Sequence, residues 1–555
     1  MNSSASTVSS SSNRPLIIIL ILAILINTAG IGIKFFTDDP GLYAVLARTM
    51  AQTNNFSDLM YHGRDWLDKP HFPFWVIAVS FKIFGFNTIA YKLPALLFFF
   101  MSVAYTFKLT KKFYDQATAL IAILLLLTAQ HVLISNTDVR AEPYIMGLLV
   151  GSVYHFYKVK ERFRFTDILL AALFAACAVM TKGIYLLIPI GIAIIGNYLF
   201  KKDYKGLFSW KWLLAVILVC LFTLPEIYTL YIQFDLHPEK VVFNHTGISG
   251  IHWFLWDSQF GRFNNNSYIR NGHGSIFFFL HTLLWAYAPW AIIFFYALLK
   301  NIRQIIKGIP QPEYVCISGG LLMLLIFSIS KFQLPFYTNI LFPFFSVITA
   351  VFIRRLTAGA EFKFFRITQY ILSGLLLLIL VLLNIIFAPE YAWVGLLIIA
   401  VLCLLVYYIF KTGGPAYQPV LLFTCCAVIA VNSWIIAIVY PTLVRYRGDV
   451  SSAAYINQHY PGQPLITNVS TNGLDFYLHQ PVNTFTNPDT LNTPGFKNKL
   501  ILTDQNTIGQ LKKNHIQFTY LQTFWNYPNE NLTPTFLVKA NREKALNQLF
   551  LIRLW

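Results

Sequence analysis

Residues 37–75 read TDDPGLYAVLARTMAQTNNFSDLMYHGRDWLDKPHFPFW. This stretch follows the first apolar segment directly, opens with Asp38 and Asp39, and ends just after Asp68 and Lys69. Ionisable groups at a membrane edge are costly unless they face water or one another, and by default they mark functional sites. The stretch therefore predicts a functional loop beside a membrane, because a chain that only crosses the bilayer needs no such segment.

The composition of the chain indicates an all-α polytopic membrane protein. Of 555 residues, 56% are hydrophobic and 12% are charged, whereas about a quarter of a soluble domain is charged. Apolar runs near twenty residues predict about thirteen transmembrane helices, the first over 15–36 and twelve more between 88–109 and 417–441. No basic block is interleaved with stacking aromatics in a polar segment, so no nucleic-acid partner is expected.

Charge predicts how the chain is oriented in the membrane. Many Lys and Arg residues concentrate in short loops on the side of Arg14, and such loops are cytoplasmic by the positive-inside rule. The Ser-rich residues 1–14 are then a disordered cytoplasmic N-terminus, and 15–441 form the membrane domain, with the outer loop at 37–87 as its candidate functional part. We expect a multi-pass protein of the plasma (inner) membrane.

The tail, residues 442–555, is polar and carries Pro-Gly and Asn-Gly turn signals. Short strand-like and helix-like runs alternate in it, which predicts a small extracytoplasmic α/β domain. Strands are expected at 464–469, 499–504, 518–524 and 535–540, and helices at 452–460 and 508–515.

Within the opening loop, Asp39-Pro40-Gly41 predicts a helix start, with Asp39 as N-cap and Pro40 at the first helical position. The amphipathic run that follows is typical of a helix in the membrane interface, and residues 73–85 predict a second one. Asp39 thus has two interpretations, a helix cap or a functional acid.

Several of these residues are similar to a known family. Asp39, Tyr43 and Arg48, followed by Asp68-Lys69-Pro70, resemble the first outer loop of the GT-C glycosyltransferases, in the branch of the lipid A aminoarabinose transferases and protein O-mannosyltransferases. Downstream, in family order over most of 15–355, similar segments are Asp138-Val139-Arg140-Ala141-Glu142, Thr181-Lys182-Gly183, Phe260 with Arg262, and Ser330-Lys331 with Tyr337. The chain departs from the family pattern at Pro40, Asp68, His71 and Glu142.

The resemblance implies a GT-C fold and transfer of a sugar from a polyprenyl-phosphate donor to a lipid, glycan or protein acceptor at the outer face, with inversion. A carboxylate must deprotonate the acceptor hydroxyl; Asp39 is the expected base, with Asp38 as the alternate and Glu142 as a further catalytic acid. Cations must stabilise the departing phosphate. The expected substrate-binding residues are Lys69, Arg262, Lys331, Tyr337, Tyr43 and Lys182.

Alternatives stay open at this point. Lys182 and Lys331 could simply extend from helix ends toward the interface. The cofactor is unknown; a divalent metal ion is one option. Asp68 and His252 are the selected ligands, and His71, His245 and His273 are further candidates. A lipid-linked saccharide flippase without covalent chemistry is the alternative function, although its charges should lie at mid-span rather than gather at one face. A non-catalytic scaffold would leave the opening loop unexplained.

Overall fold

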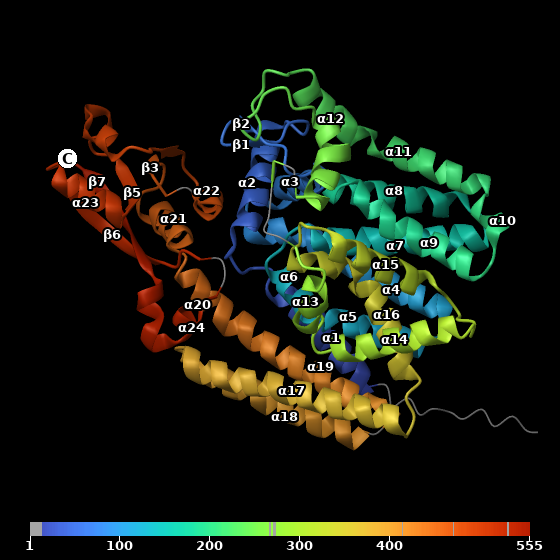
Figure 1. The fold of residues 1–555 in the computed structure, drawn as a ribbon. Coiled ribbons are helices and arrows are strands. Elements are labelled where there is room, and N and C mark those ends of the chain that lie inside the picture. Colours follow the sequence, from blue (N-terminus) through green and yellow to red (C-terminus); the bar gives the residue numbers. More distant parts are fainter. Residues whose placement is uncertain (1–13, 266–267, 270–273, 413, 470, 530–531) are drawn as a thin grey trace, which may run out of the picture.

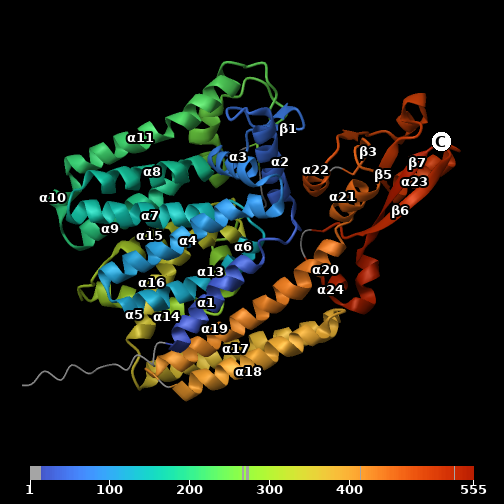
Figure 2. The same cartoon turned by 180° about the vertical axis from the view of Figure 1, so that it is seen from behind.

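The computed structural model describes residues 14–265, 268–269, 274–412, 414–469, 471–529 and 532–555. The expected disordered segment 1–14 therefore lies, except for Arg14, outside the described residues. A large bundle of helices forms one side of the molecule, and the C-terminal residues lie against the end of the bundle that carries the opening loop (Figures 1 and 2).

Within the described residues, seven helices are long and apolar enough to cross a membrane, or eight if one bent pair forms a single span. The protein is thus a multi-pass membrane protein, but the thirteen expected crossings are not reproduced by this measure. The seven are Thr88–Phe113, Phe165–Lys182, Tyr204–Asp235, Pro335–Arg354, Ala360–Phe387, Trp393–Thr412 and Tyr417–Arg445.

Breaks inside apolar runs account for much of the difference. Helices α5 (Gln116–Leu127) and α6 (Gln130–Thr137) meet at an angle of 58°. The run at 275–298 divides into α13 (Phe278–Ala286) and α14 (Ala291–Ile306) around Pro289, which has no N–H to continue a helix. Hydropathy measures the length of an apolar run and does not show where the backbone turns within it.

The opening loop contains the two predicted helices. Helix α2 (Asp38–Thr53) begins at Asp38, with Thr37 as N-cap and no side-chain cap. The prediction of Asp39 as N-cap is therefore wrong, and the Asp39 carboxylate is directed elsewhere. Strands β1 (Met60–Tyr61) and β2 (Arg64–Asp65) pair antiparallel, and α3 (Phe72–Phe84) confirms the second helix. Tyr43 and Phe74 join α2 to α3 edge to face, with ring centroids 5.2 Å apart.

In the described part of the tail, the strands follow the order β4-β3-β5-β7-β6, with β3 parallel to β4 and β5 and β7 antiparallel to β5 and β6. Their bounds are β3 (Leu465–Thr467), β4 (Val482–Thr484), β5 (Leu500–Asp504), β6 (Phe518–Asn526) and β7 (Asn547–Leu554). Three predicted strands match β3, β5 and β6. The two predicted helices match α21 (Gly448–His459) and α23 (Gln505–Lys513).

The strand predicted at 535–540 is wrong. Helix α24 (Pro534–Leu537) occupies its start, because Pro534 stands in the first turn and the Thr533 side chain accepts a hydrogen bond from the Phe536 N–H. Both features favour a helix start over a strand. Strand β7, which pairs with both β5 and β6, was not anticipated from the sequence.

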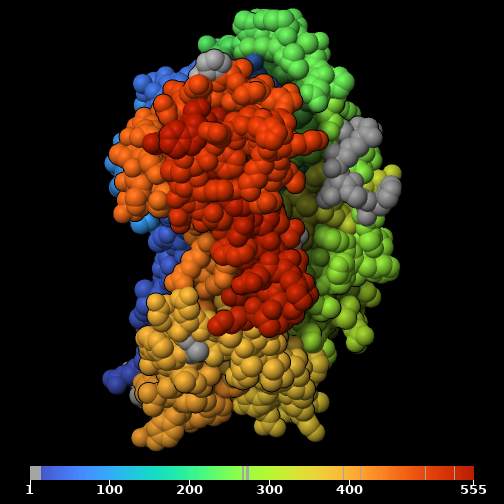
Figure 3. Space-filling view, turned by 90° about the vertical axis from the view of Figure 1, so that its left-hand side faces the viewer, coloured from blue at the N-terminus to red at the C-terminus, as the bar shows by residue number. Residues whose placement is uncertain are grey.

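The short helix α22 (Asn472–Tyr477) joins this sheet to the bundle by packing on α2. Figure 3 shows the C-terminal residues covering the molecule on this side, above the helices α17 (Ala360–Phe387) and α18 (Ala392–Thr412). The described tail is therefore in direct contact with the loop that opens at Asp38.

We expect Gly147→Ala to lower the melting temperature of the protein. Gly147 lies in α7 (Glu142–Glu161), and a Cβ there would overlap the Phe98 carbonyl of α4 (Thr88–Phe113), whose carbon lies 3.0 Å away. Overpacking of this kind costs about 1–3 kcal/mol. The matched control is Gly191→Ala in α9 (Leu187–Phe200), where a Cβ meets nothing within 4 Å. Equal melting temperatures for the two variants would contradict this account.

Candidate functional site

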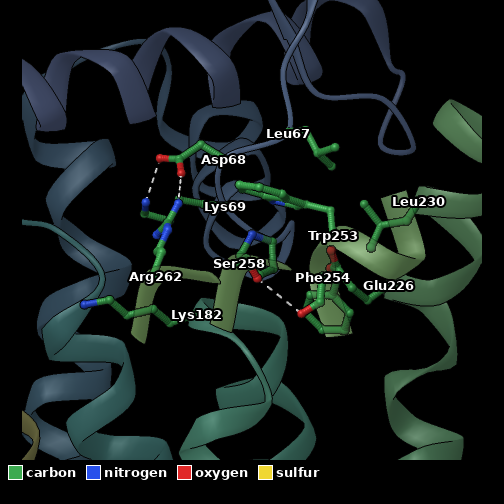
Figure 4. Close-up of a pocket in the computed structure, with 11 residues that line it drawn as sticks. Leu67, Asp68, Lys69, Lys182, Glu226, Leu230, Trp253, Phe254, Ser258 and Arg262 are labelled. Atoms are coloured by element: carbon green, nitrogen blue, oxygen red, sulfur yellow. Dashed lines mark hydrogen bonds and ion pairs between the residues drawn. The ribbon is translucent and has the colours of Figure 1, made fainter. Parts of the chain in front are cut away.

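A cluster of two cations and one carboxylate lies between the opening loop and a distant segment. Lys69 Nζ donates a hydrogen bond to Asp68 Oδ2 at 2.6 Å, and the Arg262 guanidinium donates to Asp68 Oδ1 (Figure 4). Burial lowers the pKa of Lys69. Burial also raises the pKa of Asp68, but Lys69 and Arg262 outweigh this and hold it below its ordinary value. The cluster carries a net positive charge suited to an anion.

Aromatic rings fix the position of Arg262. Its guanidinium lies 5.9 Å from the Trp253 ring and 5.7 Å from the Phe332 ring, within cation–π range. Arg262 directly follows η4 (Trp253–Gly261), a stretch of π-helix, a conformation often found at functional sites. The sequence resemblance selected Arg262, and tertiary packing brings it to Asp68.

A second ion pair, between Lys182 and Glu142, lies beside the first cluster. Lys182 ends α8 (Phe165–Lys182), and its ammonium contacts the Glu142 carboxylate at the start of α7. The same ammonium lies 4.3 Å from the centre of the Tyr337 ring. Glu142 is only 1% exposed, so it is a buried partner of Lys182 rather than an open acid.

The two acids that open the loop point to different partners. Arg140 donates to Asp39 Oδ2 at 2.6 Å, and the Asp39 side chain is 51% exposed. Asp38 instead accepts from Asn472, at 2.6 Å from the side-chain amide and 3.3 Å from the backbone N–H. Asp39 is therefore the open acid, and Asp38 is held by the C-terminal residues.

Asp138 and Arg140 extend the acidic site beyond the residues selected from the sequence. Arg140 lies 3.6 Å from Asp138, and Thr37 donates to the Asp138 carboxylate. Burial lowers the pKa of Arg140, but Asp138 and Asp39 raise it above its ordinary value. Burial, followed by Asp39 and Glu142, raises the pKa of the Tyr43 hydroxyl. The sequence feature that could have identified Asp138 and Arg140 as site residues is the Asp-Val-Arg pattern at 138–140, because it resembles the second acidic loop of the family.

An amphipathic cavity of about 600 Å³ borders the cations. Its two basic residues are Lys182 and Arg262, and its other polar lining residues are Tyr185, Ser258, Gln259, Asn264, Ser330 and Tyr337. The rest is mostly apolar and includes Ile184, Ile188, Phe260, Phe263, Met323, Ile326, Phe327 and Phe332. A smaller pocket lined by Asp68 and Lys69 shares Lys182, Ser258 and Arg262 with this cavity. The arrangement fits a molecule with an anionic head and a hydrocarbon chain.

Lys331 differs from the other expected binding residues. Its neighbours Ser330 and Phe332 line the cavity, whereas the Lys331 side chain is exposed. Its backbone N–H donates to the Phe263 carbonyl at 2.9 Å. The contribution of Lys331 to the structure is thus a backbone contact at the cavity wall.

The residues considered for a metal do not fit a divalent cation. Both Asp68 oxygens accept from cations, and His252 is an exposed residue paired with Asp257. No group of three or more His, Cys, Asp or Glu side chains with metal-binding geometry occurs in the described ranges. His273 lies outside the described residues.

His71 and Glu226 form a buried pair that sequence analysis missed. Glu226 accepts from the His71 backbone N–H and contacts His71 Nδ1, both at 3.0 Å. His71 Nε2 lies 3.0 Å from the Ser57 carbonyl, and both paired side chains are fully buried. The pair fixes the backbone immediately after Asp68-Lys69-Pro70. The sequence feature that could have identified this pair is Glu226 itself, an acid within the apolar segment 210–231.

Comparisons with known proteins agree with this geometry. The family model described as dolichyl-phosphate-mannose-protein mannosyltransferase matches residues 68–228. The crystal structure of ArnT from Cupriavidus metallidurans bound to undecaprenyl phosphate matches with a TM-score of 0.72, covering 98% of both chains at 15% identity. The chain has the GT-C fold of ArnT. The resemblance noted in the sequence is confirmed.

Sequence relatives of the ArnT type are also found. The undecaprenyl phosphate-α-4-amino-4-deoxy-L-arabinose arabinosyl transferase 1 of Pseudomonas fluorescens is 24% identical over 54% of this chain and 50% of its own length. An uncharacterised protein of Aquifex aeolicus is 25% identical over 56% of this chain and 58% of its own. The matched region thus spans about half the length of these curated relatives.

We expect Glu226→Leu to destabilise the protein. It would leave the buried His71 backbone N–H without its acceptor, at a cost of about 1–3 kcal/mol for an unsatisfied buried group. Glu226→Gln keeps a carbonyl acceptor and should lower the melting temperature less. Thermal unfolding of both purified variants tests this, and a smaller loss in the Leu variant than in the Gln variant would refute the pairing.

Proposed function

We propose that the protein is an integral-membrane glycosyltransferase that moves a sugar from a polyprenyl-phosphate carrier to a lipid, glycan or protein acceptor. The observation that supports this most is the cavity of about 600 Å³ whose apolar lining meets Lys182 and Arg262. A polyprenyl phosphate has the matching chemistry, an anionic head on a long hydrocarbon. The name of the Pseudomonas fluorescens relative and the ligand of the ArnT structure point the same way.

In this proposal Lys69 and Arg262 bind the carrier phosphate. Both already donate to Asp68, and charge-assisted hydrogen bonds to phosphate oxygens are strong. As the bond to the sugar breaks, negative charge develops on the departing phosphate, and preorganised cations stabilise it. Lys182 and Tyr337 line the neighbouring cavity wall. Tyr43 is the further proposed substrate-binding residue, with a buried hydroxyl whose pKa is raised by burial and by the charge of Asp39.

Asp39 is the proposed base. The acceptor hydroxyl oxygen attacks the anomeric carbon and gives its proton to the Asp39 carboxylate. The bond between that carbon and the phosphate oxygen breaks, its electron pair stays on the phosphate, and the polyprenyl phosphate departs. Attack opposite the leaving group inverts the anomeric centre. Arg140 orients Asp39, and Glu142 acts through Lys182 rather than on the acceptor.

The proposal includes an orientation of the chain in the membrane. The N-terminus faces the cytoplasm, and the loop 37–87 and the tail 442–555 face outward, in a plasma (inner) membrane. The loops that are rich in Lys and Arg support this orientation. About thirteen crossings would include shorter apolar helices such as α1 (Arg14–Ala29), α9 and α15 (Val315–Ile329).

A flippase remains the second candidate, because the same cavity suits a lipid phosphate that is moved without chemistry. Incubation with undecaprenyl phosphate-α-4-amino-4-deoxy-L-arabinose and other undecaprenyl-phosphate sugars, with lipid A as first acceptor, separates the two. Mass spectrometry of the acceptor should detect a covalent product. Transport in liposomes with no covalent product from any donor would favour the flippase.

Asp39→Asn should reduce sugar transfer by about 10²–10⁴-fold, the usual contribution of a general base. Binding of undecaprenyl phosphate should be retained, because Asp39 does not line the cavity. Asp58→Asn is the matched control in the same loop, where the carboxylate accepts from Asn55. Full activity of the Asp39→Asn variant would exclude this residue as the base.

Lys69→Ala and Arg262→Ala should each weaken undecaprenyl phosphate binding about ten- to a hundredfold, the range for loss of a charged hydrogen bond. Lys331→Ala should have a smaller effect because its side chain is exposed, and Lys82→Ala in α3 serves as control. Binding to the purified protein in detergent can be titrated calorimetrically. Unchanged affinity in both cluster variants would remove these cations from the donor site.

A further inference from the structure

The helix α22 contacts the opening loop along its length. Arg48 donates to the Phe476 carbonyl at 3.2 Å, and His62 lies 2.9 Å from Asp475. Tyr477 Oη accepts from the Phe35 N–H at 3.1 Å and contacts Thr88 Oγ1 at 2.9 Å. Backbone and side-chain groups of this six-residue helix therefore contact residues before, within and after α2.

Asn472 lies at the centre of this contact. It donates to both oxygens of Asp38, from its backbone N–H and its side-chain amide. Its side-chain oxygen accepts from Tyr61 Oη at 2.8 Å. The Asn472 side chain therefore connects the first turn of α2 to strand β1, two parts of the opening loop.

The close approach depends on Gly41. A Cβ at Gly41 would lie 2.7 Å from Asn472 Cβ and 3.0 Å from its backbone carbon. Real Cβ atoms essentially never lie 2.7 Å from another carbon, because van der Waals contact distances are longer. The chain therefore carries glycine where the first turn of α2 meets α22.

We propose that Asn472 is a positioning residue for the outer-loop acids: it fixes Asp38, and through the first turn of α2 it fixes the neighbouring Asp39. This inference rests on the proposed function of Asp39. Asp38 uses both carboxylate oxygens to hold α22, and Asp39 is left to face Arg140 and the acceptor. The C-terminal residues are thereby part of the catalytic arrangement although they do not line the donor cavity.

The test exchanges the two side chains. In Asn472→Asp, two carboxylates face each other at hydrogen-bonding distance, and like charges so close cannot both ionise without separating. The double variant D38N/N472D restores an amide–carboxylate pair with the same net charge, and the Tyr61 acceptor is kept. We expect N472D to lower kcat about tenfold or more, since small misplacement is costly in catalysis. The donor KM should stay unchanged, and D38N/N472D should recover most of the lost kcat.

The matched control is Asn514→Asp. Asn514 is an exposed residue of the same C-terminal region that donates to Asp489 at 2.8 Å, so it repeats the substitution away from α2. It should not change kcat. Wild-type kcat in N472D would overturn the proposal, and so would a D38N/N472D variant that folds but shows no recovery, since that result would assign chemistry to Asp38.

A second measurement does not depend on sugar transfer. Melting temperatures of D38N, N472D and D38N/N472D form a double-mutant cycle, in which contacting residues give non-additive effects. We expect the double variant to melt above N472D. Additive losses would overturn the contact itself. If the wild-type protein transfers no sugar from any donor, the proposed function fails, whereas this cycle still tests the contact between Asp38 and Asn472.

Discussion

The ion pairs of Asp68 with Lys69 and Arg262 place a net positive charge beside an apolar cavity. Ionisable groups at the edge of a membrane are stable only when they are paired or hydrated. The surrounding structure meets this condition by bringing a loop near the N-terminus to a segment almost two hundred residues later. Aromatic rings at Trp253 and Phe332 then hold the guanidinium in place.

Contacts from the helical segment around Glu226 and Gln233 hold the opening loop near this cluster. The buried pair of His71 and Glu226 fixes the backbone after Pro70, and Gln233 binds Leu59 and Asp65 from the same long helical segment. His71 is one of the positions where this chain departs from the family pattern, and here its hydrogen bonds to Glu226 restrain the backbone.

The acids Asp38, Asp39 and Asp138 are also paired, and their different partners give them different roles. Asp39 and Asp138 share Arg140, whereas Asp38 is bound by Asn472 from the far end of the chain. Two adjacent carboxylates thus differ in exposure and in partner. The difference arises because successive residues in the first turn of a helix point in different directions, one toward the C-terminal residues and one toward the second outer loop.

Composition and local patterns determined the membrane class, the two helices of the opening loop and three strands of the tail, whereas the family resemblance selected Asp39, Lys69 and Arg262 as candidates. Local patterns are sufficient there because hydropathy, turn residues and motif order are properties of short segments. Only the tertiary structure decided that Asp38 belongs to Asn472, that Glu226 restrains His71, and that apolar runs break at Thr128 and Pro289. These outcomes depend on contacts between segments far apart in the chain, which a linear pattern does not encode.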